Sequence, residues 1–134
     1  MFTVMLVDDH QPILRGLKAQ VNATGIATVV AAECDGAAAL VAARNYRPDL
    51  VLLDVSLPDM AGTDIARALL EENKELRILA VSCYTNSVFV NAMINAGASG
   101  YMLKENSIDE IKPAIKTVMS GGQWLSKDLP ELSY

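Results

Sequence analysis

The sequence has no long apolar run, few cysteines and no basic leader. Its hydrophobic stretches fall far short of the roughly 20 residues that a bilayer-spanning helix needs, which argues against a membrane protein. Residues 1–9 lack the basic region of a signal peptide and end in acidic side chains. Two cysteines without a secretion signal fit a reducing compartment, so we expect a cytoplasmic protein.

Basic residues are also in short supply. The chain has 11 Lys and Arg against 16 Asp and Glu, which is a net charge of −5. A chain with this balance is not expected to bind nucleic acid or an anionic membrane by itself. The length of 134 residues and the hydrophobic content of 51% are typical of one globular domain and exclude a disordered or collagen-like chain.

Short apolar runs alternate with amphipathic stretches along the chain. The runs favour buried strands, whereas the stretches carry apolar residues at helical spacing. The predicted strands are residues 3–7, 27–32, 50–53, 78–81 and 101–103, and the predicted helices are residues 12–23, 36–46, 63–72, 87–96 and 107–120. This alternation predicts an α/β fold: a doubly wound, five-stranded parallel sheet with right-handed crossovers and helices on both faces.

The last predicted helix and the residues after it need separate treatment. Ser107 and Glu110 have the spacing of a capping box at the start of the helix. Pro113 predicts a kink, because it lacks an amide hydrogen and its ring clashes with the preceding turn. We expect residues 1–122 to form the domain, and residues 123–134 to form a C-terminal tail or the start of a linker.

Polar side chains follow four of the five predicted strands. Asp8 and Asp9 follow the first, Asp54 the third, Ser82 the fourth and Lys104 the fifth. In open parallel sheets the binding site lies at the carboxyl ends of the strands, so these side chains are expected to meet. Three carboxylates repel one another and Lys104 alone cannot neutralise them, which predicts a hard divalent cation such as Mg²⁺.

The same set of side chains is sufficient for phosphoryl transfer to an aspartate. A carboxylate can attack phosphorus to form an aspartyl phosphate, and the reaction then needs mainly positioning and charge neutralisation. Individually, the acids could be helix N-caps or turn residues, and Ser82 could be an ordinary strand-end residue. His10, beside the acids, is more often a loop or capping residue than a metal ligand.

In combination, these residues resemble the receiver domain of bacterial two-component response regulators. The resemblance spans residues 1 to about 122, and the stretches from Val7 to His10 and from Leu103 to Leu125 point to the NarL/FixJ (LuxR-type) subgroup. The motifs that carry it are Asp8-Asp9 after a strand, Asp54 followed by Leu57-Pro58 and Gly62, Val81-Ser82, and Gly100-Tyr101-Met102-Leu103-Lys104.

The resemblance implies a flavodoxin-like (βα)5 fold with strand order 2-1-3-4-5 and a role for each site residue. Asp54 would be the phosphoacceptor. Lys104 and Ser82 would contact the phosphoryl group, and the Tyr101 ring would act as a switch that turns inward when Ser82 moves. The Mg²⁺ ligands would be Asp8, Asp9, Asp54 and the backbone carbonyl of Ser56.

The resemblance also implies partners and an output. A sensor histidine kinase or phosphotransfer protein would donate the phosphoryl group, and phosphorylation would promote a homodimer. The chain would be a signalling domain that catalyses only its own phosphorylation and dephosphorylation. It would control an effector, a C-terminal helix-turn-helix domain that is not in this chain, and would reach DNA only through that domain.

Three other interpretations are less favoured. A haloacid-dehalogenase-like phosphatase needs a second aspartate two residues after its nucleophile, but Ser56 and His10 stand at those positions. In a flavodoxin-like cofactor carrier, Asp8 and Asp9 would repel the bound phosphate. A degenerate receiver that acts only as a scaffold is weakly suggested by Glu105, where most receivers have proline. Without that proline, we expect the Lys104–Glu105 peptide bond to be trans.

Other residues leave their roles open. Cys34 and Cys83 would follow strands about 14 Å apart in the implied strand order, too far for a disulfide, so both should be free thiols. The predicted helix at residues 87–96 has more apolar residues than one core face requires, which slightly favours a partner surface. Trp124 could pack against the last helix or lie in a linker.

Overall fold

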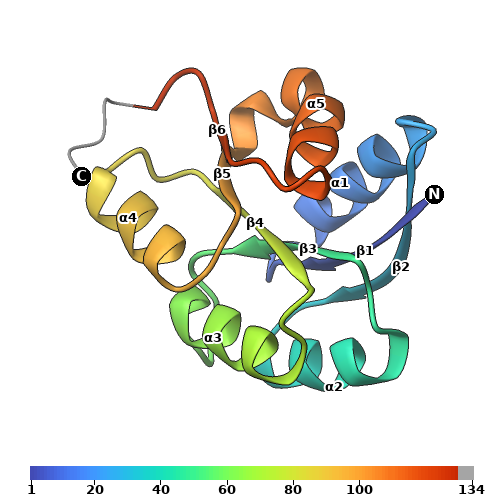
Figure 1. Ribbon diagram of the computed structural model, residues 1–134, viewed down its shortest axis with the longest axis vertical. Coiled ribbons are helices and arrows are strands. Elements are labelled where there is room, and N and C mark those ends of the chain that lie inside the picture. The colour runs from blue at the N-terminus through green and yellow to red at the C-terminus, as the bar shows by residue number, and fades with distance from the viewer. Residues whose placement is uncertain (130–134) are drawn as a thin grey trace.

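A six-stranded parallel sheet with order β2-β1-β3-β4-β5-β6 forms the centre of the molecule (Figure 1). The structure is a computed structural model that describes residues 1–129. The strands are β1 (Phe2–Val7), β2 (Ala27–Glu33), β3 (Leu50–Asp54), β4 (Arg77–Ser82), β5 (Gly100–Leu103) and β6 (Trp124–Leu125). The helices are α1 (Gln11–Ala23), α2 (Gly36–Tyr46), α3 (Gly62–Glu72), α4 (Ser87–Asn95) and α5 (Ser107–Met119), with a 3-10 turn, η1 (Lys104–Asn106), before α5.

The predicted α/β fold and the strand order 2-1-3-4-5 are confirmed, but the predicted number of five strands is wrong. The sixth strand, β6, comes from the segment expected to be a tail and pairs in parallel with β5. It has only two residues, too few to produce a periodic pattern. It forms because the edge of β5 offers free backbone groups. Residues 130–134 of the predicted tail lie outside the described residues.

Helices cover both faces of the sheet (Figure 1). Helices α1 and α5 pack together on one face, while α2, α3 and α4 follow one another across the other. Alternate residues of β1 enter the two resulting cores: Met5 and Val7 face one, and Val4 and Leu6 the other. Because every residue of β3 is buried, this central strand holds Asp54 at a fixed place.

The predicted capping box at the start of α5 is wrong. Asn106 is the N-cap residue and makes no side-chain cap, and Ser107 is already the first helical residue. Glu110 is 5% exposed and turns inward to Trp124 and Ser126. These partners lie 14 and 16 residues away in sequence, so the local pattern could not reveal them. The helix continues through Pro113, and the kink stays a prediction.

Two smaller predictions are confirmed. The Lys104–Glu105 peptide bond is trans, since residues 1–129 contain no cis peptide bond. Cys34 and Cys83 are free thiols. In addition, none of the helices within residues 1–129 has the length and hydrophobicity needed to cross a membrane.

Candidate functional site

Asp8, Asp54, Ser82 and Lys104 meet at the carboxyl edge of the sheet. Asp8 directly follows β1, Asp54 and Ser82 end β3 and β4, and Lys104 directly follows β5. These four strands are neighbours in the sheet, so all four residues lie at one edge. Lys104 contacts Asp8 and Asp54, whereas Ser82 Oγ bonds the Tyr84 N–H. The crossover helices return the chain to the opposite edge each time, which is why every strand ends here.

Lys104 lies between two buried carboxylates. Its Nζ atom is 2.8 Å from Asp8 Oδ2 and 3.6 Å from Asp54 Oδ2. The Asp8 and Asp54 side chains are only 2% and 7% exposed, whereas that of Lys104 is 17% exposed. The Lys104 ammonium group thus contacts two carboxylates that are largely shielded from water. With both carboxylates ionised, the three side chains together carry a net negative charge.

This excess of negative charge changes the pKa values in the site. Burial raises the pKa of Asp54 above its ordinary value, and the Asp8 carboxylate raises it further, while Lys104 partly offsets both. Burial lowers the pKa of Lys104, but the hydrogen bond to Asp8 and the charge of Asp54 outweigh it, so the net shift is upward. Lys104 is therefore charged at neutral pH, and Asp54 loses its proton less readily than an exposed aspartate.

The residues present fit a divalent cation. Asp9 stands at the rim with its side chain 37% exposed, and ligand atoms of Asp8, Asp9 and His10 lie within 4.8 Å of one another. A second positive charge would relieve the repulsion between Asp8 and Asp54. Carboxylate oxygens are the ligands that a hard cation such as Mg²⁺ prefers, so the aspartates are the candidate ligands. His10 Nδ1 lies 3.3 Å from Asp9 Oδ1.

The loop after Asp54 is held close to the site. The backbone N–H of Ser56 donates to Asp54 Oδ1 at 3.3 Å, and that of Gly62 donates to the Val55 carbonyl at 3.0 Å. A Cβ atom on Gly62 would lie 2.8 Å from that carbonyl oxygen, so only glycine allows the approach. The loop therefore keeps the Ser56 backbone beside Asp54.

Ser82 and Tyr101 share contacts with a residue that sequence reasoning missed. Ser82 Oγ accepts a hydrogen bond from the Tyr84 N–H at 3.0 Å, and the Tyr101 hydroxyl donates to the Tyr84 carbonyl at 2.9 Å. The Tyr101 side chain is fully buried, and burial raises the pKa of its hydroxyl. The ring therefore lies inward in this structure, and its role as a switch stays a prediction.

The family profile described as "Response regulator receiver domain" matches residues 4–116. The chain belongs to the response regulator receiver family. Among solved structures, the LuxR-family two-component regulator of Aurantimonas sp. SI85-9A1 has a TM-score of 0.92 at 30% identity, over 96% of this chain and 92% of that one. The receiver domain of the putative regulator NarL from Mycobacterium tuberculosis has a TM-score of 0.84 at 31% identity, over 90% of this chain and 97% of that one.

Curated relatives of this receiver domain are transcriptional regulators. The transcriptional regulatory protein DegU of Brevibacillus brevis is 31% identical over 122 residues, which is 91% of this chain and 52% of DegU. The transcriptional activator DevR/DosR of Mycobacterium tuberculosis is 38% identical over 121 residues, which is 90% of this chain and 56% of DevR/DosR. The receiver domain thus spans about half the length of these relatives.

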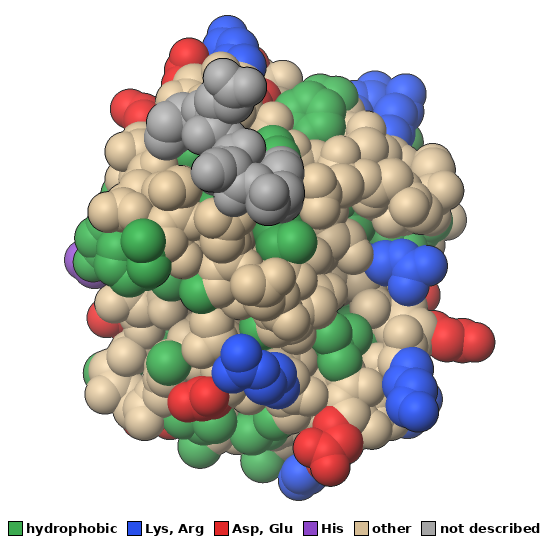
Figure 2. Space-filling view, turned by 60° about the vertical axis from the view of Figure 1, so that its left-hand side comes forward, with side chains coloured by type: hydrophobic (Ala, Val, Ile, Leu, Met, Phe, Trp, Pro, Cys, Tyr) green, Lys and Arg blue, Asp and Glu red, His purple; other side chains and the backbone are tan. Residues whose placement is uncertain are grey.

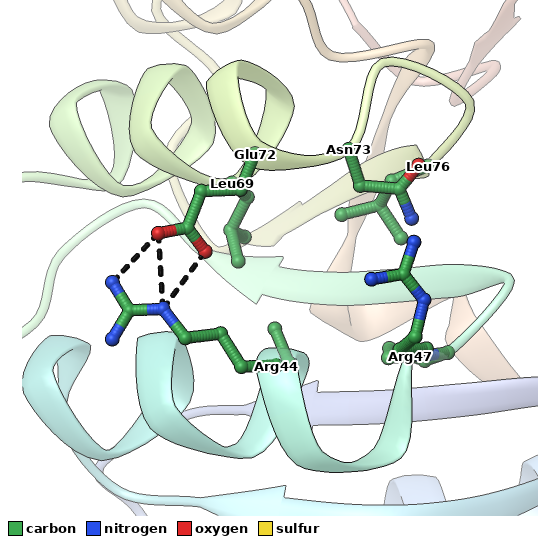
Figure 3. Close-up of a pocket in the computed structure, with 8 residues that line it drawn as sticks. Arg44, Arg47, Leu69, Glu72, Asn73 and Leu76 are labelled. Atoms are coloured by element: carbon green, nitrogen blue, oxygen red, sulfur yellow. Dashed lines mark hydrogen bonds and ion pairs between the residues drawn. The ribbon is translucent and has the colours of Figure 1, made fainter.

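A separate cavity of about 80 Å³ lies between α2 and α3 (Figure 3). Arg44 and Glu72 form an ion pair at one end of it, with 2.6 Å between Nη2 and Oε1. Arg47, at the C-cap of α2, lies at the other end and points toward Asn73. The cavity borders the start of β3, at the sheet edge opposite Asp54, so it is not part of the receiver site.

Proposed function

We propose that Asp54 accepts a phosphoryl group from a histidine kinase or a phosphotransfer protein. The observation that carries this proposal is the Lys104 ammonium group, which contacts both Asp8 and Asp54 at the ends of adjacent strands. A haloacid-dehalogenase-like phosphatase is not favoured because Ser56 replaces the required second acid. A degenerate scaffold would not need to keep two buried carboxylates and a cation together.

The chain's own residues would perform most of the reaction. An Asp54 carboxylate oxygen attacks phosphorus, the new O–P bond forms, and the P–N bond to the donor histidine breaks. The imidazole leaves with the electron pair and takes a proton from solvent. The positive charge of Lys104 is then available to a phosphoryl oxygen. The Ser82 hydroxyl, which accepts from the Tyr84 N–H and keeps its own hydrogen free, can donate to another.

A metal ion would complete the neutralisation of charge. Asp8, Asp9, Asp54 and the Ser56 carbonyl would hold Mg²⁺, which would supply positive charge to the remaining phosphoryl oxygen. The buried Asp8–Asp54 pair, with one lysine for two carboxylates, supports this ligand set. Ser56 N–H, which donates to Asp54 Oδ1, orients the attacking carboxylate.

Incubation with acetyl phosphate tests the proposed function. With Mg²⁺, we expect the intact mass to increase by one phosphoryl group, because the site supplies the nucleophile and the charge. Hydroxylamine should remove this group, since it cleaves acyl phosphates but not phosphate esters. A sample with chelator in place of Mg²⁺ is the control. No added mass at any Mg²⁺ concentration would contradict the proposal.

Asp9→Ala should raise the Mg²⁺ requirement at least about tenfold, because it removes a direct carboxylate ligand. Titration calorimetry measures Mg²⁺ binding independently of phosphorylation. Asp109→Ala, at an exposed position on α5, is the matched control and should bind Mg²⁺ like the wild type. An unchanged titration for Asp9→Ala would exclude Asp9 as a ligand.

The output is proposed to pass through the surface near Ser82 and Tyr101. Tyr84 stacks on Phe89 of α4 with 4.7 Å between ring centroids, so both site residues connect to this helix. Tyr84, Val88 and Phe89 are 40%, 69% and 40% exposed. On the face that includes α4, hydrophobic side chains reach the surface in several places (Figure 2). Phosphorylation would alter this surface near α4. A cytoplasmic, DNA-binding effector domain would respond to the altered surface.

Phosphorylation is expected to strengthen self-association through α1 and α5. These helices pack together, and Ile108 of α5 is 79% exposed, which leaves an apolar side chain for a second copy. Sedimentation velocity should show a monomer or weak dimer alone and a larger dimer fraction with beryllofluoride and Mg²⁺. Ile108→Asp should reduce that fraction. Identical distributions with and without beryllofluoride over a wide concentration range would contradict this prediction.

A further inference from the structure

The β6 segment, residues 124–129, is hydrogen-bonded along β5. The Ser126 N–H donates to the Tyr101 carbonyl at 3.0 Å, and Ser126 Oγ accepts from the Leu103 N–H at 2.9 Å. Figure 1 shows β6 beside β5 and close to α5. Ser126 therefore uses both its backbone and its side chain to hold the last part of β5, directly before Lys104.

Glu110 of α5 holds Ser126 in turn. The Ser126 hydroxyl donates to Glu110 Oε1, and the Trp124 indole N–H donates to the same oxygen at 3.1 Å. Ser126 is 4% exposed and Glu110 is 5% exposed, so water cannot easily replace these bonds. The hydroxyl thus connects the backbone of β5 to a buried carboxylate on α5.

The packing of the β6 segment is equally specific. Trp124 packs against the core under α1 and α5, while Leu125 and Leu129 pack against the core on the other face. A Cβ atom on Gly100 would lie 2.6 Å from the Trp124 carbonyl oxygen, so the close pairing of β6 with β5 requires glycine there. The segment is therefore a built-in part of the sheet edge.

We propose that Ser126 and Glu110 are positioning residues for the phosphorylation site, and that the β6 segment responds to the state of that site. This inference rests on the proposed function. Strand β5 carries Tyr101, the predicted switch residue, and ends at Leu103, next to Lys104. Ser126 bonds the backbone of both Tyr101 and Leu103. A movement of the β5 backbone that accompanies a change at Tyr101 or Lys104 therefore changes the Ser126 bonds. By thermodynamic linkage, the Ser126 bonds then bias the site.

Trp124 reports on this coupling, because it is the one tryptophan in the sequence. In the 134-residue chain, we expect beryllofluoride with Mg²⁺ to change the intensity or wavelength of its emission. Asp54→Asn should show no such change, which separates site binding from a solvent effect. An emission spectrum that stays constant while mass spectrometry shows phosphorylation by acetyl phosphate would overturn the coupling.

Substitution of Ser126 tests the positioning role. Ser126→Ala should slow phosphorylation by acetyl phosphate about tenfold at saturating Mg²⁺, because Lys104 is less well placed. Mg²⁺ affinity should not change, since the proposed ligands lie at the ends of β1 and β3 and not on β5. Ser126→Thr keeps the hydroxyl and should restore the rate. Ser120→Ala, at the exposed end of α5, is the matched control.

The outcomes separate this inference from the proposed function. If the wild-type chain is not phosphorylated, the proposed function fails. If it is phosphorylated and Ser126→Ala reacts at the wild-type rate, or Ser126→Thr does not recover it, the positioning role fails alone. Circular dichroism checks that Ser126→Ala is folded. If it is not, the Trp124 emission of the wild-type chain tests whether the β6 segment is coupled to the site.

Discussion

Asparagine at position 54 is expected to abolish the phosphorylation of this receiver domain. The amide of Asp54→Asn keeps the size of the side chain but cannot act as a carboxylate nucleophile, so labelling by acetyl phosphate should fall at least about a hundredfold. Intact-mass spectrometry measures the labelled fraction directly. Asp109→Asn, at an exposed position on α5, is the matched control and should be labelled like the wild type. Equal labelling of Asp54→Asn and the wild type would exclude Asp54 as the phosphoacceptor.

The same substitution should also raise the stability of the protein at neutral pH. Burial and Asp8 raise the native pKa of Asp54, so its ionised form opposes folding once the pH exceeds the ordinary pKa of an aspartate. Removal of this charge should stabilise the fold by about 1 kcal/mol. The gain should shrink as the pH falls through the raised native pKa of Asp54 and vanish below the ordinary pKa of an aspartate, where the wild-type carboxyl is protonated in both states. Urea unfolding at several pH values measures it.

Lys104→Met should have the opposite effect on stability, together with a severe loss of phosphorylation. It leaves Asp8 and Asp54 buried without their shared cation, which should cost about 2 kcal/mol in the free energy of unfolding. This is less than for a fully buried pair, because the Lys104 side chain keeps 17% of its surface exposed. Urea unfolding without divalent cations measures the loss.

Lys112→Met is the matched control, since Lys112 is exposed on α5 and should be nearly neutral on substitution. Mg²⁺ should recover part of the stability lost in Lys104→Met, because a cation that binds the native site shifts the equilibrium toward the folded state. If Lys104→Met were as stable as Lys112→Met without Mg²⁺, then the charge of Lys104 would not balance the two carboxylates.

The sequence by itself determined the fold class and the place of the site. Hydrophobic period is a local property, so runs such as residues 50–53 predict strands without knowledge of their neighbours. Parallel strands joined by helices all end at one edge of the sheet, which brings Asp8, Asp54 and Lys104 together whatever the details of packing. The residues that follow the strands were therefore predictable as a cluster.

Only the tertiary structure decided what depends on partners distant in the sequence. Strand β6 has two residues and forms because β5 leaves an edge for it, so it has no pattern of its own. Glu110 fits a capping box by spacing, yet Ser126 and Trp124 bind its carboxylate in the core. The inward ring of Tyr101 likewise depends on the Tyr84 carbonyl, 17 residues away. A local pattern predicts which groups can form hydrogen bonds, but burial selects the partner, because a polar group inside the core must be satisfied wherever its partner lies in the chain.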